Sequence, residues 1–210
     1  MKTIKILILA FFAVLLIGCS DHGSDASNKS TVKPSKSHTT ILLQPLGDFS
    51  QKEALQLKQE LEKRLVPMVD VHIDTIKLLP AKPLQKEWFN AAHTRYRGNI
   101  ILKSLAPKEK HTTIIALMHN DISTNLHGYD DWGVLGLSMH CYHSCVVSTY
   151  RLGSKNRLWQ TACHEFIHTY YHWPHCPKDN PDCIMRDAKG KGDFRGKTDL
   201  CDYCKNLIGR

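Results

Sequence analysis

This chain of 210 residues lacks any internal repeat and any hydrophobic run long enough for a standard membrane span. Its longest apolar run, residues 6–17, is too short to cross a bilayer in the usual way. The absence of repeats argues against a solenoid or propeller. At this length the sequence predicts one folded domain, with at most a small appendage.

The N-terminal segment does not have the pattern of a folded region. Lys2 and Lys5 precede the apolar run, which ends in Leu16-Ile17-Gly18-Cys19. This resembles a bacterial lipoprotein signal, and the resemblance implies cleavage before Cys19 and lipidation of its thiol. A simple secretory signal and an uncleaved anchor are the alternatives. All three place the folded part outside the cytoplasm.

Residues 20–40 contain almost no apolar side chains and therefore cannot bury a core. We expect a signal peptide at residues 1–18, a flexible tether at 19–40 and a folded domain at 41–210. The formal net charge of +8 is spread along the chain. Because the domain is expected to be exported, we interpret this charge as a solvated surface and expect no nucleic-acid partner.

The run His164-Glu165-Phe166-Ile167-His168 is the strongest chemical signal in the sequence. On a helix, residues four apart share one face, so both imidazoles can reach a single ion. Glu165 then lies beside the open coordination position, where a water would bind. This pattern is typical of a zinc hydrolase that uses glutamate as general base.

A catalytic zinc needs a third protein ligand, and two histidines follow the motif. His172 continues the series of four, but on an unbroken helix it would lie about 12 Å from His164. Pro174 favours a break that brings a later histidine back toward the ion. We therefore favour His175 over His172 as the third ligand.

Four cysteines that span about thirty residues follow the motif. Of the eight in the chain, seven remain if Cys19 is lipidated, and an odd number cannot all form disulfides. The spacing fits a four-thiolate zinc site or two disulfides about equally well in an oxidising compartment. The residues concerned are Cys176, Cys183, Cys201 and Cys204.

The sequence from residue 41 onward resembles the archaemetzincins, most strongly from Asp130. Their pattern is H-E-x-x-H-x-x-G-x-x-H-C, then C-x-M, then C-x-x-C. Residues 131–136 and 146–152 also resemble the strand segments that precede the motif in this family. The resemblance implies a catalytic zinc on His164, His168 and His175, Glu165 as base, and Met185 beneath the metal. It further implies a structural zinc on the four cysteines, hence two zinc ions per chain.

The chain departs from this pattern after the second histidine. The pattern's glycine is absent, and the spacing from His168 to His175 is one residue longer. Glycine in such a place supplies a positive φ that turns the chain back. Histidine is among the residues that tolerate this conformation, so we expect His172 or a wider loop to replace the glycine.

Local patterns predict the remaining elements. Ser50 with Glu53 forms a capping box for a helix that Pro67 ends. We interpret His140 to His143 as a loop with a candidate Cys141–Cys145 disulfide. Strands are predicted at 41–46, 69–76, 112–118, within 130–137 and within 144–152, helices at 50–65, 85–96 and 156–170, and either state at 99–105.

Together these features predict an α/β (α+β) metzincin-like fold. It has a mixed sheet, a helix carrying the motif, and a small zinc-stapled C-terminal subdomain. The expected function is peptide-bond hydrolysis by a monomeric zinc metalloprotease. Its partners are a peptide or protein substrate and, through the lipid anchor, a membrane of the cell envelope. The alternatives are a catalytically inactive zinc-binding or interaction lipoprotein and a disulfide-stapled domain without metal.

Overall fold

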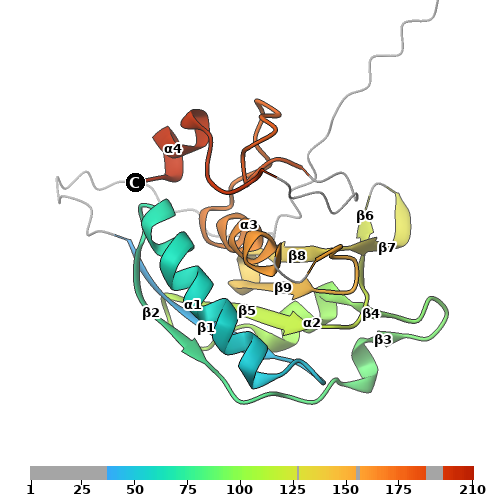
Figure 1. Cartoon of the computed structure of the whole chain (residues 1–210). Helices are drawn as coiled ribbons and strands as arrows, with labels where there is room; N and C mark the ends of the chain where they lie inside the picture. Colours follow the sequence, from blue (N-terminus) through green and yellow to red (C-terminus); the bar gives the residue numbers. More distant parts are fainter. Residues whose placement is uncertain (1–36, 127, 155–156, 188–195) are drawn as a thin grey trace, which may run out of the picture.

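The computed structural model describes residues 37–126, 128–154, 157–187 and 196–210 (Figure 1). The expected signal peptide, Cys19 and most of the expected tether lie outside the described residues. Among the described residues, no helix has both the length and the apolar character needed to span a bilayer.

The main sheet has five strands and mixed pairing, as predicted. In spatial order these are β2 (His72–Leu78), β1 (His38–Pro45), β5 (Thr112–Met118), β9 (Ser144–Ser148) and β8 (Gly136–Met139). The first four are parallel, and β8 pairs antiparallel with β9 at the edge. β1 begins at His38, slightly before the predicted start at residue 41.

Helices cover both faces of this sheet. α1 (Gln51–Met68) and α3 (Leu158–Tyr171) pack on one face, while α2 (Gly98–Leu105) packs on the other (Figure 1). The central strand β5 is buried on both sides, so Ile115 and Leu117 join one core and Ile114 and Ala116 the other. This explains why β5 reads as a continuous apolar run rather than an alternating one.

A smaller four-stranded sheet extends from the β8 side. It contains β3 (Phe89–Asn90), β4 (Arg95–Arg97), β6 (Ile122–Leu126) and β7 (Tyr129–Val134). The buried carboxylate of Asp121 binds Arg95 and, through two bonds, Arg151, which ties this sheet to the segment after β9. The chain ends with the short helix α4 (Asp202–Ile208).

The predicted helix over residues 85–96 is wrong. Only a 3-10 turn, η1 (Lys86–Trp88), forms there, followed by β3 and β4. The Asn90 side chain accepts a hydrogen bond from the Ala92 backbone, and Thr94 has a φ of 55°. Local side-chain bonds of this kind compete with helical ones and favour a turn.

The capping box of α1 is present as predicted, with reciprocal bonds between Ser50 and Glu53. Pro67, however, does not end the helix, which continues to Met68. A proline this close to the end removes only one helical hydrogen bond. The Val69 N–H still closes the last turn by donating to the Leu65 carbonyl, at 3.3 Å.

Candidate active site

The site is built on α3, which lies between α1 and the β8–β9 edge of the sheet. Its apolar residues pack on three sides, and Ala162, Phe166 and Ile167 are fully buried. This helix is therefore held by packing rather than by a cap, since Arg157 before it makes no side-chain capping bond. Rigid packing positions the motif residues that α3 carries.

His164 and His168 lie one turn apart and face each other. The Nδ1–H of His164 donates to the Ile184 carbonyl at 2.8 Å, and the Nδ1–H of His168 donates to the Trp173 carbonyl. A neutral imidazole has one N–H, so both Nε2 atoms are left with lone pairs. These two Nε2 atoms are 3.0 Å apart.

At the end of α3, a histidine takes the place of the missing glycine. Helix α3 runs to Tyr171, and His172 after it adopts the left-handed conformation with φ 52° and ψ 32°. His172 precedes His175 by three residues, as the glycine precedes the last histidine in the archaemetzincin pattern. Relative to that pattern, the extra residue lies between His168 and His172, and the spacing from His172 to His175 is unchanged.

The turn brings His175 back to the first two histidines. Its ring centroid is 5.2 Å from that of His164 and 4.8 Å from that of His168. One ligand atom from each of the three lies within 4.8 Å of the others. His172 is elsewhere, with its ring stacked on His140 at 4.9 Å. Asp187 lies 4.0 Å from His175 Nδ1 and can orient that ring.

The three histidines fit a metal ion. Burial lowers the pKa of His164 well below its usual value and that of His168 to about 4; the pKa of His175 is lowered too. Neutral imidazoles are the form that binds a metal. Two lone pairs 3.0 Å apart repel each other unless a cation lies between or beside them, and two of the rings already have carbonyl partners that fix their tautomers.

Glu165 follows His164 on α3, and its side chain lies against β8. A Cβ added at Gly136 would lie 2.6 Å from the Glu165 Cγ and Oε1, so only glycine admits this carboxylate. Burial raises the pKa of Glu165 to about 8, and a hydrogen bond with Ser138 opposes that shift. A dication nearby would stabilise the carboxylate form and lower this pKa.

The four cysteines gather into a second cluster. Their sulfur atoms all lie within 4.8 Å of one another, and none is in a disulfide. The pairs Cys176–Cys201 and Cys183–Cys204 are 3.6 and 3.8 Å apart, far beyond a disulfide bond. Burial raises the pKa of the Cys183 thiol to about 11, and the hydrogen bond that the Cys201 N–H donates to its sulfur at 3.4 Å opposes this shift. Four such sulfurs suit tetrahedral zinc.

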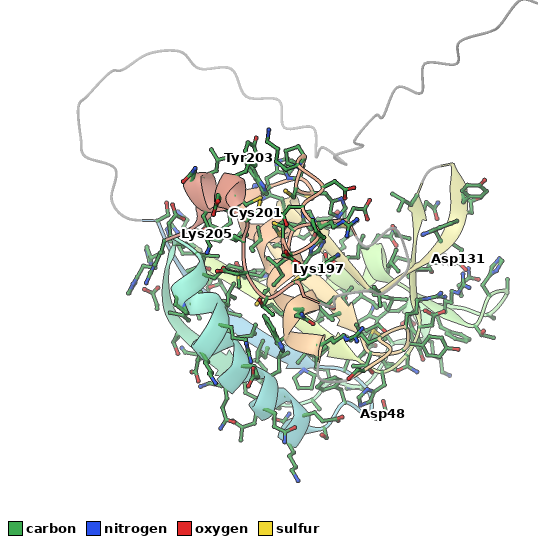
Figure 2. The ribbon with its side chains drawn as sticks, turned by 45° about the horizontal axis from the view of Figure 1, so that its top comes forward. Asp48, Asp131, Lys197, Cys201, Tyr203 and Lys205 are labelled. Carbon is green, nitrogen blue, oxygen red and sulfur yellow. The ribbon has the colours of Figure 1, made fainter. Side chains whose placement is uncertain are left out.

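The segment that contains this cluster is fastened to α3 (Figure 2). Lys197 is buried; its Nζ donates to the Arg186 carbonyl, and its own carbonyl accepts from Gln160 of α3 at 2.7 Å. Cys176 follows His175 directly, and its N–H donates to the carbonyl of the buried Met185. The cysteine cluster and the histidine cluster therefore share one short segment.

Other residues considered from the sequence have structural places. The Cys141–Cys145 disulfide is wrong, because Cys145 is a buried free thiol. Cys163 is likewise a buried free thiol. The Tyr171 hydroxyl donates to Asp70 at 2.6 Å, which holds the end of α3 against the start of β2. Within the described residues, only the two clusters above group three or more ligands closely enough for a metal.

Sequence reasoning missed the partners of the histidines and the contact of Glu165 with β8. Two of these partners are backbone carbonyls, of Trp173 and Ile184, which no side-chain pattern reveals. The contact at Gly136 could have been suspected from the sequence, since a glycine within a strand often marks close approach of another group.

The geometry defines an α/β domain with a three-histidine cluster on a core helix and a four-thiol cluster beside it. No protein-family model matches the sequence, and no curated protein matches it. Solved structures do match it by fold. Archaemetzincin from Archaeoglobus fulgidus, solved with malonate, has a TM-score of 0.61 and 22% identity, covering 80% of this chain and 99% of its own.

Archaemetzincin from Methanopyrus kandleri gives a TM-score of 0.62 at 18% identity, covering 84% of this chain and 96% of that one. A zinc-dependent peptidase from Methanocorpusculum labreanum gives 0.59 at 17% identity, covering 79% and 98%. The chain therefore has the archaemetzincin fold, as the sequence resemblance implied. At these identities the likeness establishes the fold alone.

Proposed function

We propose that this protein is a zinc-dependent peptidase of archaemetzincin type. The observation that carries the proposal is the convergence of His164, His168 and His175 at the end of α3, with Glu165 beside them on the same helix. The similar folds include two archaemetzincins and a zinc-dependent peptidase, which supports the same activity.

In this proposal, His164, His168 and His175 hold the catalytic zinc. When bound, zinc acts as a Lewis acid that acidifies water and polarises the substrate carbonyl. The carbonyls of Ile184 and Trp173 keep the Nδ1 protons of two ligands in place, so those rings present Nε2. Asp187 orients the third ring.

Glu165 is the general base. Its carboxylate takes a proton from the attacking water and then delivers a proton to the leaving amine. Because Glu165 is buried between α3 and β8, its position is set by packing. Ser138 holds the carboxylate by a hydrogen bond and favours its charged form.

β8 is the element best placed to hold a substrate. Among the described residues it is an edge strand that pairs with β9 alone, and its residues Gly136 and Ser138 adjoin Glu165. An extended peptide can add to such an edge through backbone hydrogen bonds. A peptide paired with β8 would pass directly beside the general base, which suits hydrolysis of an internal peptide bond.

The four cysteines hold a second, structural zinc in this proposal. In the described part of the segment from Cys176 to the C-terminus, the buried apolar side chains besides the cysteines are Ile184, Met185, Leu200 and Ile208. So small a core makes a metal staple the expected means of ordering the segment. Because Cys176 adjoins His175, this zinc would also position the third ligand of the catalytic ion. The count is then two zinc ions per chain.

We further propose that the protein is a monomer tethered through a lipid on Cys19 to a membrane of the cell envelope. The support comes from the N-terminal sequence pattern. Membrane fractionation, with labelling by a radioactive fatty acid, tests it on the wild type and on Cys19→Ala. A Cys19→Ala protein that takes up as much label as wild type contradicts the anchor.

Metal analysis together with peptide-library cleavage tests the proposed activity. Wild-type protein should contain near two zinc per chain and cleave peptides, whereas Glu165→Ala should keep the zinc and lose cleavage. Two zinc ions without cleavage in the wild type would support the alternative of an inactive zinc-binding lipoprotein. Near zero zinc in freshly purified protein would contradict both.

A further inference from the structure

A cavity of about 520 Å³ lies on the side of α3 that faces α1. Its lining comes from α1, from the first turn of α3 and from the residues that follow β1 and β9. The two residues that α3 contributes, Leu158 and Trp159, precede the motif by more than a turn. The residues that line the cavity are Phe49, Glu53, Gln56, Leu57, Gln59, Glu60, Arg64, Thr149, Leu158 and Trp159.

The cavity lies where an open α/β sheet is expected to bind ligands. From β1 the chain passes through α1 to β2 on one side, then crosses through α2 to β5 on the other side. The strand order therefore reverses between β1 and β5, and crevices form outside the carboxyl ends of strands at such points. Phe49 follows β1 and His119 follows β5, and their rings stack across this point at 4.7 Å.

A chain of hydrogen bonds holds this end of the sheet together. His119 Nε2 donates to the Glu53 carboxylate at 3.2 Å, and His119 Nδ1 lies 2.7 Å from the Thr149 hydroxyl. Glu53 and Thr149 both line the cavity. Its walls from α1 and from the β9 end are thus fixed relative to each other before any ligand binds, which lowers the cost of binding.

The lining combines an apolar floor with an excess of negative charge. Phe49, Leu57 and Trp159 are buried beneath the opening. Glu53 and Glu60 lie two turns apart on α1, and their side chains remain 28% and 40% exposed. The positive charge in the lining, Arg64, lies 4.3 Å above the Trp159 ring, and its Nε donates to Glu60 at 2.6 Å.

With His119 neutral, the cavity has one net negative charge on a chain whose formal charge is +8. Its size suits a small molecule, since ligand pockets span about 300–1,000 Å³. A flat apolar body fits over the aromatic and aliphatic floor, and an ammonium or guanidinium end fits beside the carboxylates. Both glutamates would repel an anion, and the positive charge of Arg64 is already paired with Glu60.

We propose that this cavity is a second binding site, separate from the histidine cluster, for a small organic cation with an aromatic or other flat apolar body. The site is built from α1, the first turn of α3 and the strand ends, and it does not require the proposed peptidase activity. Bound ligand would bridge α1 and the first turn of α3, and it would therefore stabilise the packing of these two helices.

The test uses the purified full chain and tryptamine, which joins an indole to a primary ammonium. Isothermal titration should give a Kd of about 1 mM or tighter, the range expected for a ligand of this size. Indole-3-propionate, which has a similar body and the opposite charge, should bind at least about five-fold more weakly. Equal affinity for the two compounds, or no binding of tryptamine, would overturn the proposal.

A pair of variants on α1 assigns the binding to the cavity. Glu60→Gln removes a lining carboxylate and should weaken tryptamine binding about five-fold, the effect of losing roughly 1 kcal/mol. Glu62→Gln changes a glutamate of similar exposure on the same helix that does not line the cavity, and it should leave the Kd unchanged. If both variants bind like wild type, tryptamine binds elsewhere and the proposal is wrong.

Discussion

The Nε2 atoms of His164 and His168 lie 3.0 Å apart, while both Nδ1 atoms donate to backbone carbonyls. Because the proton of each ring is on Nδ1, the lone pairs of the two Nε2 atoms point toward the same place. His175 reaches the same point from the turn after α3. An arrangement of this kind is unfavourable in itself and becomes favourable when a cation binds.

His172 should be replaceable by glycine. Its φ of 52° is the conformation that glycine adopts without strain. We expect His172→Gly to change the free energy of unfolding by less than about 1 kcal/mol and to keep the full zinc content. His172→Val places a β-branched residue there and should cost about 1–2 kcal/mol. Denaturant unfolding and metal analysis measure both, and a loss of zinc in His172→Gly would show that this ring is a ligand.

Gly136 should be essential for the position of Glu165. A methyl group there would meet the Glu165 carboxylate at 2.6 Å and push it from its place. We expect Gly136→Ala to reduce peptide cleavage by about 10- to 100-fold while the zinc content stays the same. Gly153→Ala is the matched control, since no atom lies within 4 Å of its added methyl group. Full activity in Gly136→Ala would contradict the role given to Glu165.

Much of the fold could be predicted because its patterns are local. The capping box of α1, the buried strand β5 and the helix with the motif each have a signature within a few residues. The failure at residues 85–96 has a local cause as well, since the Asn90 side chain and the positive φ of Thr94 favour turns over a helix. Apolar periodicity alone does not register such competition.

Part of the candidate site could also be predicted from the sequence, because its pattern is local. Residue types and spacing identify His164, Glu165 and His168, and a break near Pro174 points to His175. The extra residue before His175 becomes understandable only when His172 is seen to adopt the left-handed conformation at the end of α3. The contact of Gly136 with Glu165 joins residues far apart in the sequence, and no local pattern encodes it.

The four-thiol cluster should behave as a metal site rather than as a pair of disulfides. We expect Cys183→Ser to lose one zinc per chain and to lower stability, because the C-terminal segment loses its staple. Cys163→Ala removes a buried thiol outside the cluster and should keep both zinc ions. Metal analysis and thermal unfolding report the difference. Stability that falls on treatment with a reductant, and not with a chelator, would instead indicate disulfides.

The metal-free protein should lose stability as the pH rises from about 6.5 to 8. Burial raises the pKa of Glu165 in the folded chain to about 8, so the folded state holds a proton that the unfolded state releases near 4.5. The contribution falls by up to ~1.4 kcal/mol per pH unit in this window. Glu165→Gln should flatten this slope, as measured by denaturant unfolding of both metal-free proteins. An unchanged slope would show that Glu165 is not the group responsible.

Below this window, the histidines act in the opposite direction. Burial lowers the pKa of His168 in the folded state to about 4. The unfolded state therefore binds a proton near pH 6.5 that the folded state binds only near pH 4. His164, whose pKa is also lowered well below its usual value, acts in the same direction, and the two histidines together outweigh Glu165. Stability of the metal-free protein should therefore fall as the pH decreases from 6.5 to 4. A double variant, His164→Gln with His168→Gln, should lose this acid sensitivity. If it unfolds in acid like the wild type, other groups set the acid limit.

Anomalous diffraction at the zinc edge, on crystals of the protein as purified, tests the central claim most directly. The account predicts one peak at about 2.0–2.1 Å from a ring nitrogen of each of His164, His168 and His175. A second peak should lie among the four cysteine sulfurs. A histidine site without zinc, or a zinc there with the ring of His175 turned into solvent, would contradict it.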